Sequence, residues 1–191
     1  VIYEGVSIEQ FHPERQNDLP ERPFAGRYVL MVASLYPNKN IDKAICAFRN
    51  VVDRGMPHHL LIVGNDWHHY RKELEKLVKR LHLEERVHFV GGVKHEEIPA
   101  YFKHAELFLM ISTVESFGLP VLEAMASGVP VLISQRSSLP EIAGNAALTV
   151  DIQNTNHIAD QMVRILTDRA LSNSLRERGH TRARSFDWNE T

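Results

Sequence analysis

LFLMISTVESFGLPVLEAMASGVPVLIS occupies residues 107–134 and contains one complete strand–helix–strand pattern. Two apolar runs, 107–111 and 129–133, flank a polar loop and a segment that opens with Gly118 and Pro120 and closes at Gly128. Short, nearly continuous apolar runs are typical of parallel strands buried on both faces. Proline in the first turn and glycine just past the last turn are typical of a helix. The stretch therefore predicts a βαβ unit.

The same alternation extends to both sides of this unit. Further short, mostly apolar runs occupy residues 28–33, 59–63, 87–90 and 147–150. Apolar residues at helical spacing form stripes that begin at Ile41, Tyr70, Ile98 and Ile158. Strands that alternate with helices through short connections predict an α/β, Rossmann-like, doubly wound parallel sheet of about six strands. Such sheets bind ligands beyond the carboxyl ends of their strands, so we expect the site in the loops 34–40, 64–67, 91–95, 112–119 and 134–139.

Length and composition narrow the possibilities. The 191 residues suit one domain, which we place at residues 28–191, after a proline-punctuated entry segment, 1–27, that we expect to be irregular. Because the chain begins at Val1 with residues typical of folded protein, we expect it to start inside a longer protein.

The formal net charge of −2 gives no general attraction to nucleic acid. The single cysteine, Cys46, excludes an internal disulfide and favours a reducing, cytoplasmic location. No apolar run approaches the roughly 18 residues of a membrane span.

Two glutamates, Glu115 and Glu123, stand eight positions apart in the central unit. The loop between the strand and the helix leaves the backbone amides of Phe117, Gly118 and Leu119 at the end of the sheet. A helix N-terminus with free amides suits a diphosphate. Glu123 lies one turn further on, where it can accept hydrogen bonds from the vicinal hydroxyls of a ribose. The residue types alone also fit a capped, solvated pair of glutamates on an ordinary helix.

The segment resembles the E-x7-E signature of the retaining GT-B glycosyltransferases, in particular glycosyltransferase family 4. Residues 1–11, 32–40, 87–93 and 139–142 are similar, in the same order, to other motifs of that family. The resemblance implies the C-terminal, donor-binding half of a GT-B fold. It also implies a hexosyltransferase of polysaccharide biosynthesis that moves a sugar from a UDP- or GDP-linked donor to a glycan or a lipid-linked saccharide.

The resemblance implies roles for three charged side chains. Lys39 matches the lysine that neutralises the diphosphate leaving group, and Glu115 matches the glutamate at the donor sugar; these two are the expected catalytic residues. Glu123 matches the glutamate that holds the nucleotide ribose. The other expected donor-binding residues are Ser34, Gly92, Val93, Lys94, Ser116, Phe117, Gly118 and Leu119, with the base near residues 92–94.

One position departs from the family pattern. Many members carry an arginine where this chain has Ser34, and that arginine shares the diphosphate with the lysine. Some subfamilies place a second basic residue further along the same loop, in the stretch 37–40, where this chain has Asn38. Arg136, after the fifth strand, either supplies the second charge or is a solvated arginine; both interpretations stay open.

We expect no metal and no cofactor. Lys39 and the helix N-terminus can stabilise a departing diphosphate without a metal, and the phosphate loops lack paired acidic residues. The 11 histidines include His58-His59 and His68-His69, but adjacent residues on a helix do not share a face, so we expect surface histidines rather than chelators.

Other classes fit less well. A dinucleotide-dependent oxidoreductase would carry G-x-G-x-x-G after its first strand, and a P-loop NTPase would carry G-x-x-x-x-G-K-[ST]; the chain has neither. A GT-B sugar-nucleotide epimerase and a non-catalytic nucleotide-sugar-binding domain remain as alternatives. In GT-B enzymes the acceptor site belongs to the N-terminal domain, which can also associate peripherally with a membrane. We therefore expect this chain to bind donor without transferring it.

Overall fold

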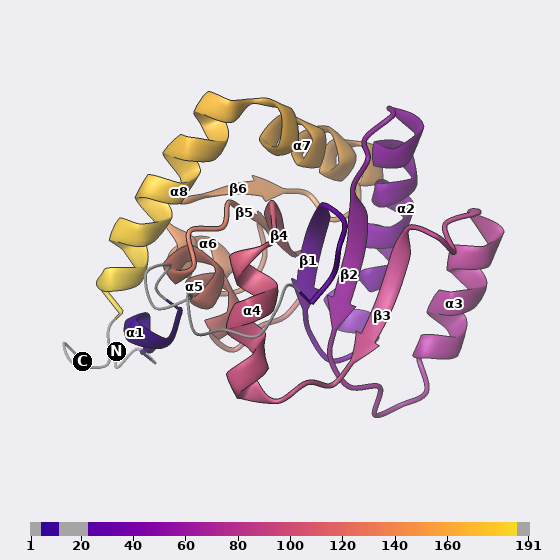
Figure 1. Cartoon of the computed structure of the whole chain (residues 1–191), viewed down its shortest axis with the longest axis horizontal. Coiled ribbons are helices and arrows are strands. Elements are labelled where there is room, and N and C mark those ends of the chain that lie inside the picture. Colours follow the sequence, from indigo (N-terminus) through magenta and orange to yellow (C-terminus); the bar gives the residue numbers. More distant parts are fainter. Residues whose placement is uncertain (1–4, 12–22, 187–191) are drawn as a thin grey trace.

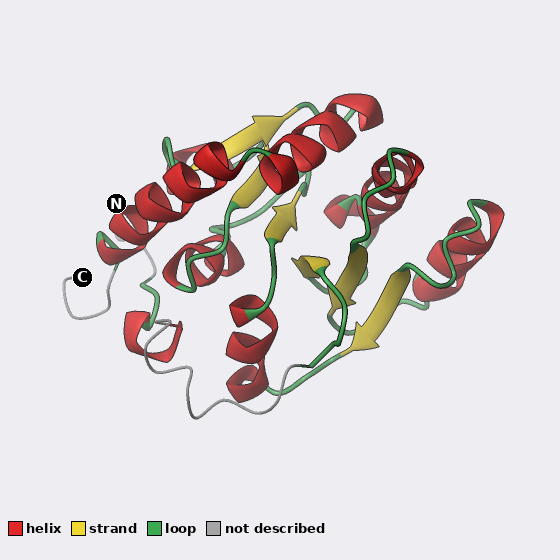
Figure 2. Ribbon diagram, turned by 45° about the horizontal axis from the view of Figure 1, so that its top comes forward, coloured by secondary structure: helices red, strands yellow, loops and turns green. Residues whose placement is uncertain are grey.

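Six parallel strands form the centre of the computed structural model, which describes residues 5–11 and 23–186 (Figure 1; Figure 2). The order in the sheet is β3-β2-β1-β4-β5-β6. The six-stranded, Rossmann-like sheet predicted from the alternation is thereby confirmed. The strands are β1 (Tyr28–Val32), β2 (His59–Val63), β3 (Val87–Gly91), β4 (Leu107–Met110), β5 (Val131–Ser134) and β6 (Ala147–Val150).

Helices cover both faces of the sheet, as Figure 1 shows. One face packs against α2 (Ile41–Asp53), α3 (Arg71–Arg80) and α7 (Thr155–Thr167). The other packs against α1 (Ile8–Phe11), α4 (Ile98–Lys103), α5 (Leu119–Ala126), α6 (Leu139–Ala143) and α8 (Arg169–Arg184).

Alternation along β1 explains why the sheet is buried on both sides. Val29 and Met31 face the α2 side, whereas Tyr28 and Leu30 face the α5 side, and all four are at most 1% exposed. Successive strand side chains point to opposite faces, so a strand between two helical layers must be apolar throughout. No helix within the described ranges has the length and apolar character needed to cross a membrane.

One prediction about the ends of the chain is wrong, and one helix near the C-terminus was not predicted. The entry segment was expected to be irregular, but Ile8–Phe11 form the short helix α1, and Phe11 is buried against Phe102. Residues 1–4 and 12–22 of that segment lie outside the described residues. The long helix α8 was not predicted because its buried stripe contains Leu175, Gly179 and Ala183, whose small members carry little hydrophobic signal. At Gly179 an added Cβ would lie 3.2 Å from Met125 Cγ, so α8 packs closely on α5.

The prediction that the paired histidines lie on the surface is wrong for His58. This side chain is fully buried just before β2, and its Nε2 lies 3.2 Å from a carboxylate oxygen of Glu106, which precedes β4. Arg27, before β1, donates two hydrogen bonds to the same carboxylate at 2.7 and 2.8 Å. Burial lowers the pKa of His58, which favours the neutral ring. The amino ends of β1, β2 and β4 are thus tied together by polar contacts.

Candidate functional site

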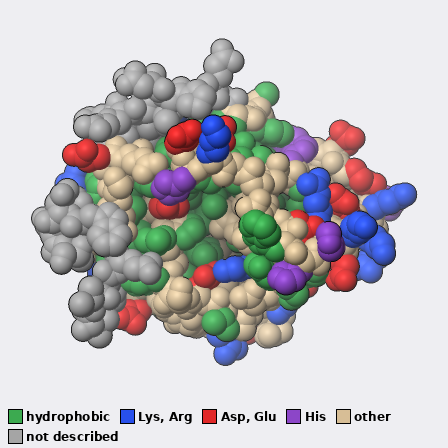
Figure 3. Space-filling model, turned by 90° about the horizontal axis from the view of Figure 1, so that it is seen from below, with side chains coloured by type: hydrophobic (Ala, Val, Ile, Leu, Met, Phe, Trp, Pro, Cys, Tyr) green, Lys and Arg blue, Asp and Glu red, His purple; other side chains and the backbone are tan. Residues whose placement is uncertain are grey.

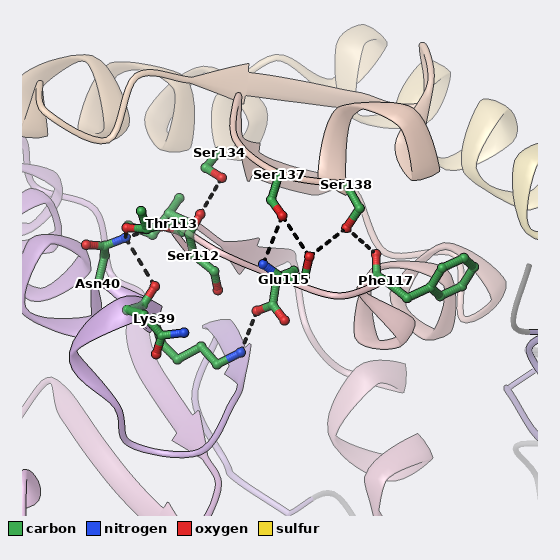
Figure 4. Close-up of polar contacts among 11 residues, drawn as sticks. Lys39, Asn40, Ser112, Thr113, Glu115, Phe117, Ser134, Ser137 and Ser138 are labelled. Atoms are coloured by element: carbon green, nitrogen blue, oxygen red, sulfur yellow. Dashed lines mark hydrogen bonds and ion pairs between the residues drawn. The ribbon is translucent and has the colours of Figure 1, made fainter.

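The sheet order creates a crevice between β1 and β4. The chain proceeds outward from β1 to β2 and β3, and then returns to the other side of β1 with β4. The loops that follow β1 and β4 therefore diverge, and ligands of such sheets bind at this switch point. The loop after β1 carries Lys39, and the loop after β4 carries Glu115 (Figure 4).

Asn40 joins these two loops. It adopts the left-handed conformation with φ of 53°, between a short 3-10 turn, Pro37–Lys39, and helix α2. Its side-chain amide donates to the carbonyl of Ile111 at 2.7 Å and to the hydroxyl of Thr113 at 3.0 Å. The Thr113 amide in turn donates to the carbonyl of Asn38 at 2.8 Å. These bonds hold Lys39 at the mouth of the crevice.

Two serines after β5 hold the loop that carries Glu115, as Figure 4 shows. The Ser137 hydroxyl donates to the carbonyl of Glu115 at 2.7 Å and accepts a hydrogen bond from the Glu115 amide at 3.1 Å. The Ser138 hydroxyl donates to the carbonyl of Phe117 at 3.0 Å. Sequence reasoning selected the loop 134–139 but missed these serines, because a hydroxyl that binds a distant backbone leaves no local pattern.

Lys39 and Glu115 form an ion pair across the crevice. The ammonium nitrogen lies 2.6 Å from a carboxylate oxygen, and the two side chains are only 18% and 10% exposed. A pair that is shielded from water interacts more strongly than a surface pair. Any anion that binds Lys39 must therefore share this cation with Glu115.

The N-terminus of α5 adds hydrogen-bond donors to the same place. Gly118 precedes the helix with φ of 103°, and an added Cβ there would lie 2.8 Å from Leu139 Cδ2, so the turn requires glycine. Within the described residues, the amides of Ser116, Gly118 and Leu119 donate to no protein acceptor. Free amides and the helix dipole favour a bound anion here.

Two adjoining hollows of about 250 Å³ each lie along these loops and share Val32, Ala33 and Pro120. The first is lined by Lys39, Glu115, Ser116, Gly118 and Leu119. The second is lined by Ser34, Gly64, Asn65, Gly92 and Val93. In Figure 3 this end of the sheet shows hydrophobic side chains in the middle of the face, with charged and histidine side chains around them.

The loop 64–67 was among those expected at the site, but the sequence did not single out Gly64 and Asn65, which line the second hollow. An added Cβ at Gly64 would lie 2.0 Å from the carbonyl oxygen of Ala33, so the loops after β1 and β2 approach too closely for any side chain. An added Cβ at Gly92 would lie equally close to Asn65 Oδ1. A lone glycine after an apolar run gave the only hint in the sequence.

Four expected or candidate residues line neither hollow: Lys94, Phe117, Arg136 and Glu123. The Lys94 side chain is 78% exposed, and its backbone amide already donates to the Glu97 carboxylate at 2.8 Å. The side chain of Phe117 is buried and packs edge-on against Phe186. Arg136 is exposed to solvent. The geometry therefore gives Arg136 no contact with the hollows that would replace the charge missing at Ser34.

Glu123 is buried, with 9% of its surface exposed, which rules out the interpretation of a solvated glutamate. It lies on α5 one turn beyond Leu119 and Pro120, both of which line the hollows. Burial raises the pKa of its carboxyl to about 7. Hydrogen-bond donors from a ligand would stabilise the ionised form of this buried carboxyl, which burial alone disfavours.

Solved structures resemble the whole domain. HepE of Anabaena in complex with UDP and glucose superposes with a TM-score of 0.85 at 22% identity, over 98% of this chain and 52% of that chain. The C-terminal domain of a glycosyl transferase group 1 family protein from Francisella tularensis superposes with a TM-score of 0.82 at 25% identity, over 95% of this chain and 97% of that chain. These likenesses confirm the predicted Rossmann-like half of a GT-B fold.

Sequence comparison gives the family. The O-antigen chain mannosyltransferase B of Escherichia coli is 32% identical over 163 residues, which are 84% of this chain and 42% of that protein. This chain thus spans less than half the length of that relative. The pattern of the glycosyl transferases group 1 family matches residues 15–182, most of the sequence. The chain therefore belongs to the glycosyl transferases group 1 family.

Proposed function

We propose that this chain binds the nucleotide-sugar donor of a retaining hexosyltransferase of glycosyltransferase family 4, as the C-terminal domain of a GT-B enzyme. One observation carries the proposal: Lys39 and the free amides at the start of α5 line the same hollow at the switch point of the sheet. A cation beside a helix N-terminus is the combination that a diphosphate requires. The UDP in the HepE structure supports a nucleoside diphosphate as the ligand.

The two hollows suggest how the donor divides between them. The diphosphate would lie at Lys39 and the amides of Gly118 and Leu119, with the sugar beside Glu115 in the first hollow. The base would occupy the second hollow, near Gly92 and Val93. The ribose would then lie between them, toward Glu123 on α5. In this arrangement the side chain of Lys94 makes no contact with the donor.

The chemistry follows from the charge that develops during transfer. The bond between the anomeric carbon and the diphosphate oxygen breaks, and its electron pair stays on the diphosphate. The acceptor hydroxyl forms the new bond on the same face of the sugar and passes its proton to the departing diphosphate oxygen. Lys39 and the α5 amides stabilise the growing negative charge of the leaving group without a metal. Glu115 accepts hydrogen bonds from sugar hydroxyls and orients the reacting carbon.

The acceptor would bind to a part of the enzyme beyond these residues. The relative from Escherichia coli is more than twice as long as the matched region. We therefore propose that residues 28–191 bind donor but transfer no sugar by themselves. A mannosyl donor is the first to test, because that relative is named a mannosyltransferase, and a glycan or lipid-linked saccharide is the proposed acceptor class.

Calorimetry with UDP, GDP, ADP and their sugars tests the proposal. We expect one nucleoside diphosphate to bind, and Lys39→Ala to weaken it. Lys72→Ala is the matched control, because Lys72 is exposed on α3 and lines neither hollow. Failure of every nucleotide to bind at about 1 mM, the weak end of specific affinities, would refute the proposal.

A further inference from the structure

A polar hollow of about 460 Å³ lies at the amino ends of the strands, which form the amino edge of the sheet, away from the proposed donor site. It forms where the end of α7 and the first half of α8 pass over the residues that precede β1 and β4. Its polar and charged lining includes Arg27, Glu106, Arg169, Ser172, Asn173 and Arg176. We call it the amino-edge hollow.

The charges of the amino-edge hollow do not balance. Glu106 supplies its single carboxylate, and Arg27 already binds both oxygens of that group. His58 also contacts Glu106, but burial favours its neutral form, so this histidine adds no positive charge to the hollow. Arg169 and Arg176 form no direct ion pair with a carboxylate among the described residues, although Glu106 attracts Arg176 at longer range. The hollow therefore has an excess of two positive charges.

Arg176 is the more informative of these two arginines. Its guanidinium is half-buried, and its one protein acceptor among the described residues is the carbonyl of Gly128. Burial lowers its pKa, because the charged form loses solvation. A guanidinium has five N–H donors in a planar fork, so most of them stay available to a ligand in the hollow.

The spacing of α8 places the remaining donors on one face. Ser172, Asn173 and Arg176 follow Arg169 by three, four and seven positions, which is the repeat of a single helix face. Seven residues of helix span roughly 10 Å, so two long arginine side chains can converge on one anion between them. The Ser172 hydroxyl and the Asn173 amide add neutral donors at the middle of that face.

We propose that the amino-edge hollow binds a small phosphate-bearing anion, such as a phosphate monoester or pyrophosphate. Guanidinium groups bind phosphate through paired hydrogen bonds, and the hollow offers two of them with neutral donors between. The bound anion would link α8 to the residues before β1 and β4. This site is separate from the proposed donor site, because it lies at the amino ends of the strands and the donor site lies at their carboxyl ends.

Titration of pyrophosphate into isotope-labelled protein, followed by NMR, tests the proposal. The Lys39→Ala background removes the main anion ligand of the donor hollow. We expect amide shifts in residues 169–176 and at Arg27. Arg169→Ala and Arg176→Ala should each weaken pyrophosphate binding by about tenfold, the effect of one charge-assisted hydrogen bond. Arg184→Ala is the matched control, since it removes the same charge from an exposed position on α8 outside the hollow.

Several results would overturn the proposal. These are shifts confined to the loops after β1 and β4, unchanged affinity in both arginine variants, or no binding at about 10 mM, beyond the millimolar range of weak affinities. Binding only to vesicles that contain phosphatidate, with none to pyrophosphate, would replace a small anion by a membrane surface. Arg176→Ala loses the bond to Gly128. If this variant does not fold, Arg169→Ala decides, because Arg169 is exposed and makes no such bond within the described part of the chain.

Discussion

Lys39 and Glu115, 76 residues apart in the chain, meet at 2.6 Å across the switch point of the sheet. Each side chain is held by a loop that is itself bonded to another loop, through Asn40 on one side and Ser137 on the other. The cation proposed for the diphosphate and the carboxylate proposed for the sugar therefore form one unit. Their effects on donor binding should be coupled.

The coupling is measurable in a double-mutant cycle. Glu115→Gln keeps the shape but removes the carboxylate that shares Lys39, so nucleoside diphosphate should bind about fivefold more tightly. The same change in Lys39→Ala protein should give no such gain. We expect a coupling free energy of about 1 kcal/mol by calorimetry. Equal effects of Glu115→Gln in both backgrounds would show that the ion pair does not influence binding.

Glu123 should make stability depend on pH in an unusual direction. The pKa of its carboxyl is about 7 in the folded protein and 4.5 in its unperturbed form. Between these values the folded state holds a proton that the unfolded state has lost, so the unfolding free energy falls as pH rises from about 4.5 to 7. Above pH 7 the loss is complete, at roughly 3 kcal/mol.

Urea denaturation of wild type and Glu123→Gln, at pH 5 and at pH 8, measures this effect. The glutamine side chain of the variant cannot ionise. The unfolding free energy of the variant, measured relative to that of wild type, should therefore be higher at pH 8 than at pH 5. Glu73→Gln, at an exposed position on α3, is the control and should follow the wild type. Identical pH dependence in wild type and Glu123→Gln would mean that Glu123 is not buried as described.

The sequence predicted the fold well because the fold depends on local patterns. Apolar runs such as 107–111 must be buried wherever they lie, and Gly118 and Gly128 mark the ends of a helix without reference to the rest of the chain. The paired glutamates were equally visible. Contacts between distant segments were not: the bonds of Ser137 to Glu115 and the burial of His58 beside Glu106 depend on the assembled sheet.

Lys39 should act on rate more than on affinity in the complete enzyme. Charge on the diphosphate grows toward the transition state, so an interaction that strengthens there raises turnover. Lys39→Ala should reduce kcat by about 10²–10³, the cost of one stabilising donor. Lys39→Arg should recover part of this loss, whereas nucleoside without phosphates should bind both variants as it binds wild type.

Steady-state kinetics with Lys72→Ala as control measures the effect of Lys39. A change in kcat within a factor of about three would contradict the role assigned to Lys39, because a removed oxyanion-stabilising donor costs far more. The charge would then have to come from a different residue. Arg136 is a poor substitute, since it lines neither hollow, and Arg136→Ala in the same assay should leave kcat unchanged.

Glu123 should also make nucleotide binding depend on pH. A carboxylate accepts two ribose hydroxyls better than a carboxylic acid does, so binding favours the ionised form and lowers the pKa of Glu123 from about 7. Affinity for the nucleoside diphosphate should rise between pH 6 and pH 8, and protons should be released on binding near pH 7. At pH 8, Glu123→Ala should cost roughly 1.5–3 kcal/mol of affinity, the range for hydrogen bonds to a charged group. Calorimetry in buffers of different ionisation enthalpy counts the released protons.

Deoxyribose analogues should bind wild type weakly and bind Glu123→Ala about as well as the ribose forms do. Equal discrimination against deoxyribose in both proteins would place the ribose away from Glu123, and the raised pKa would then reflect burial in the α5 layer alone.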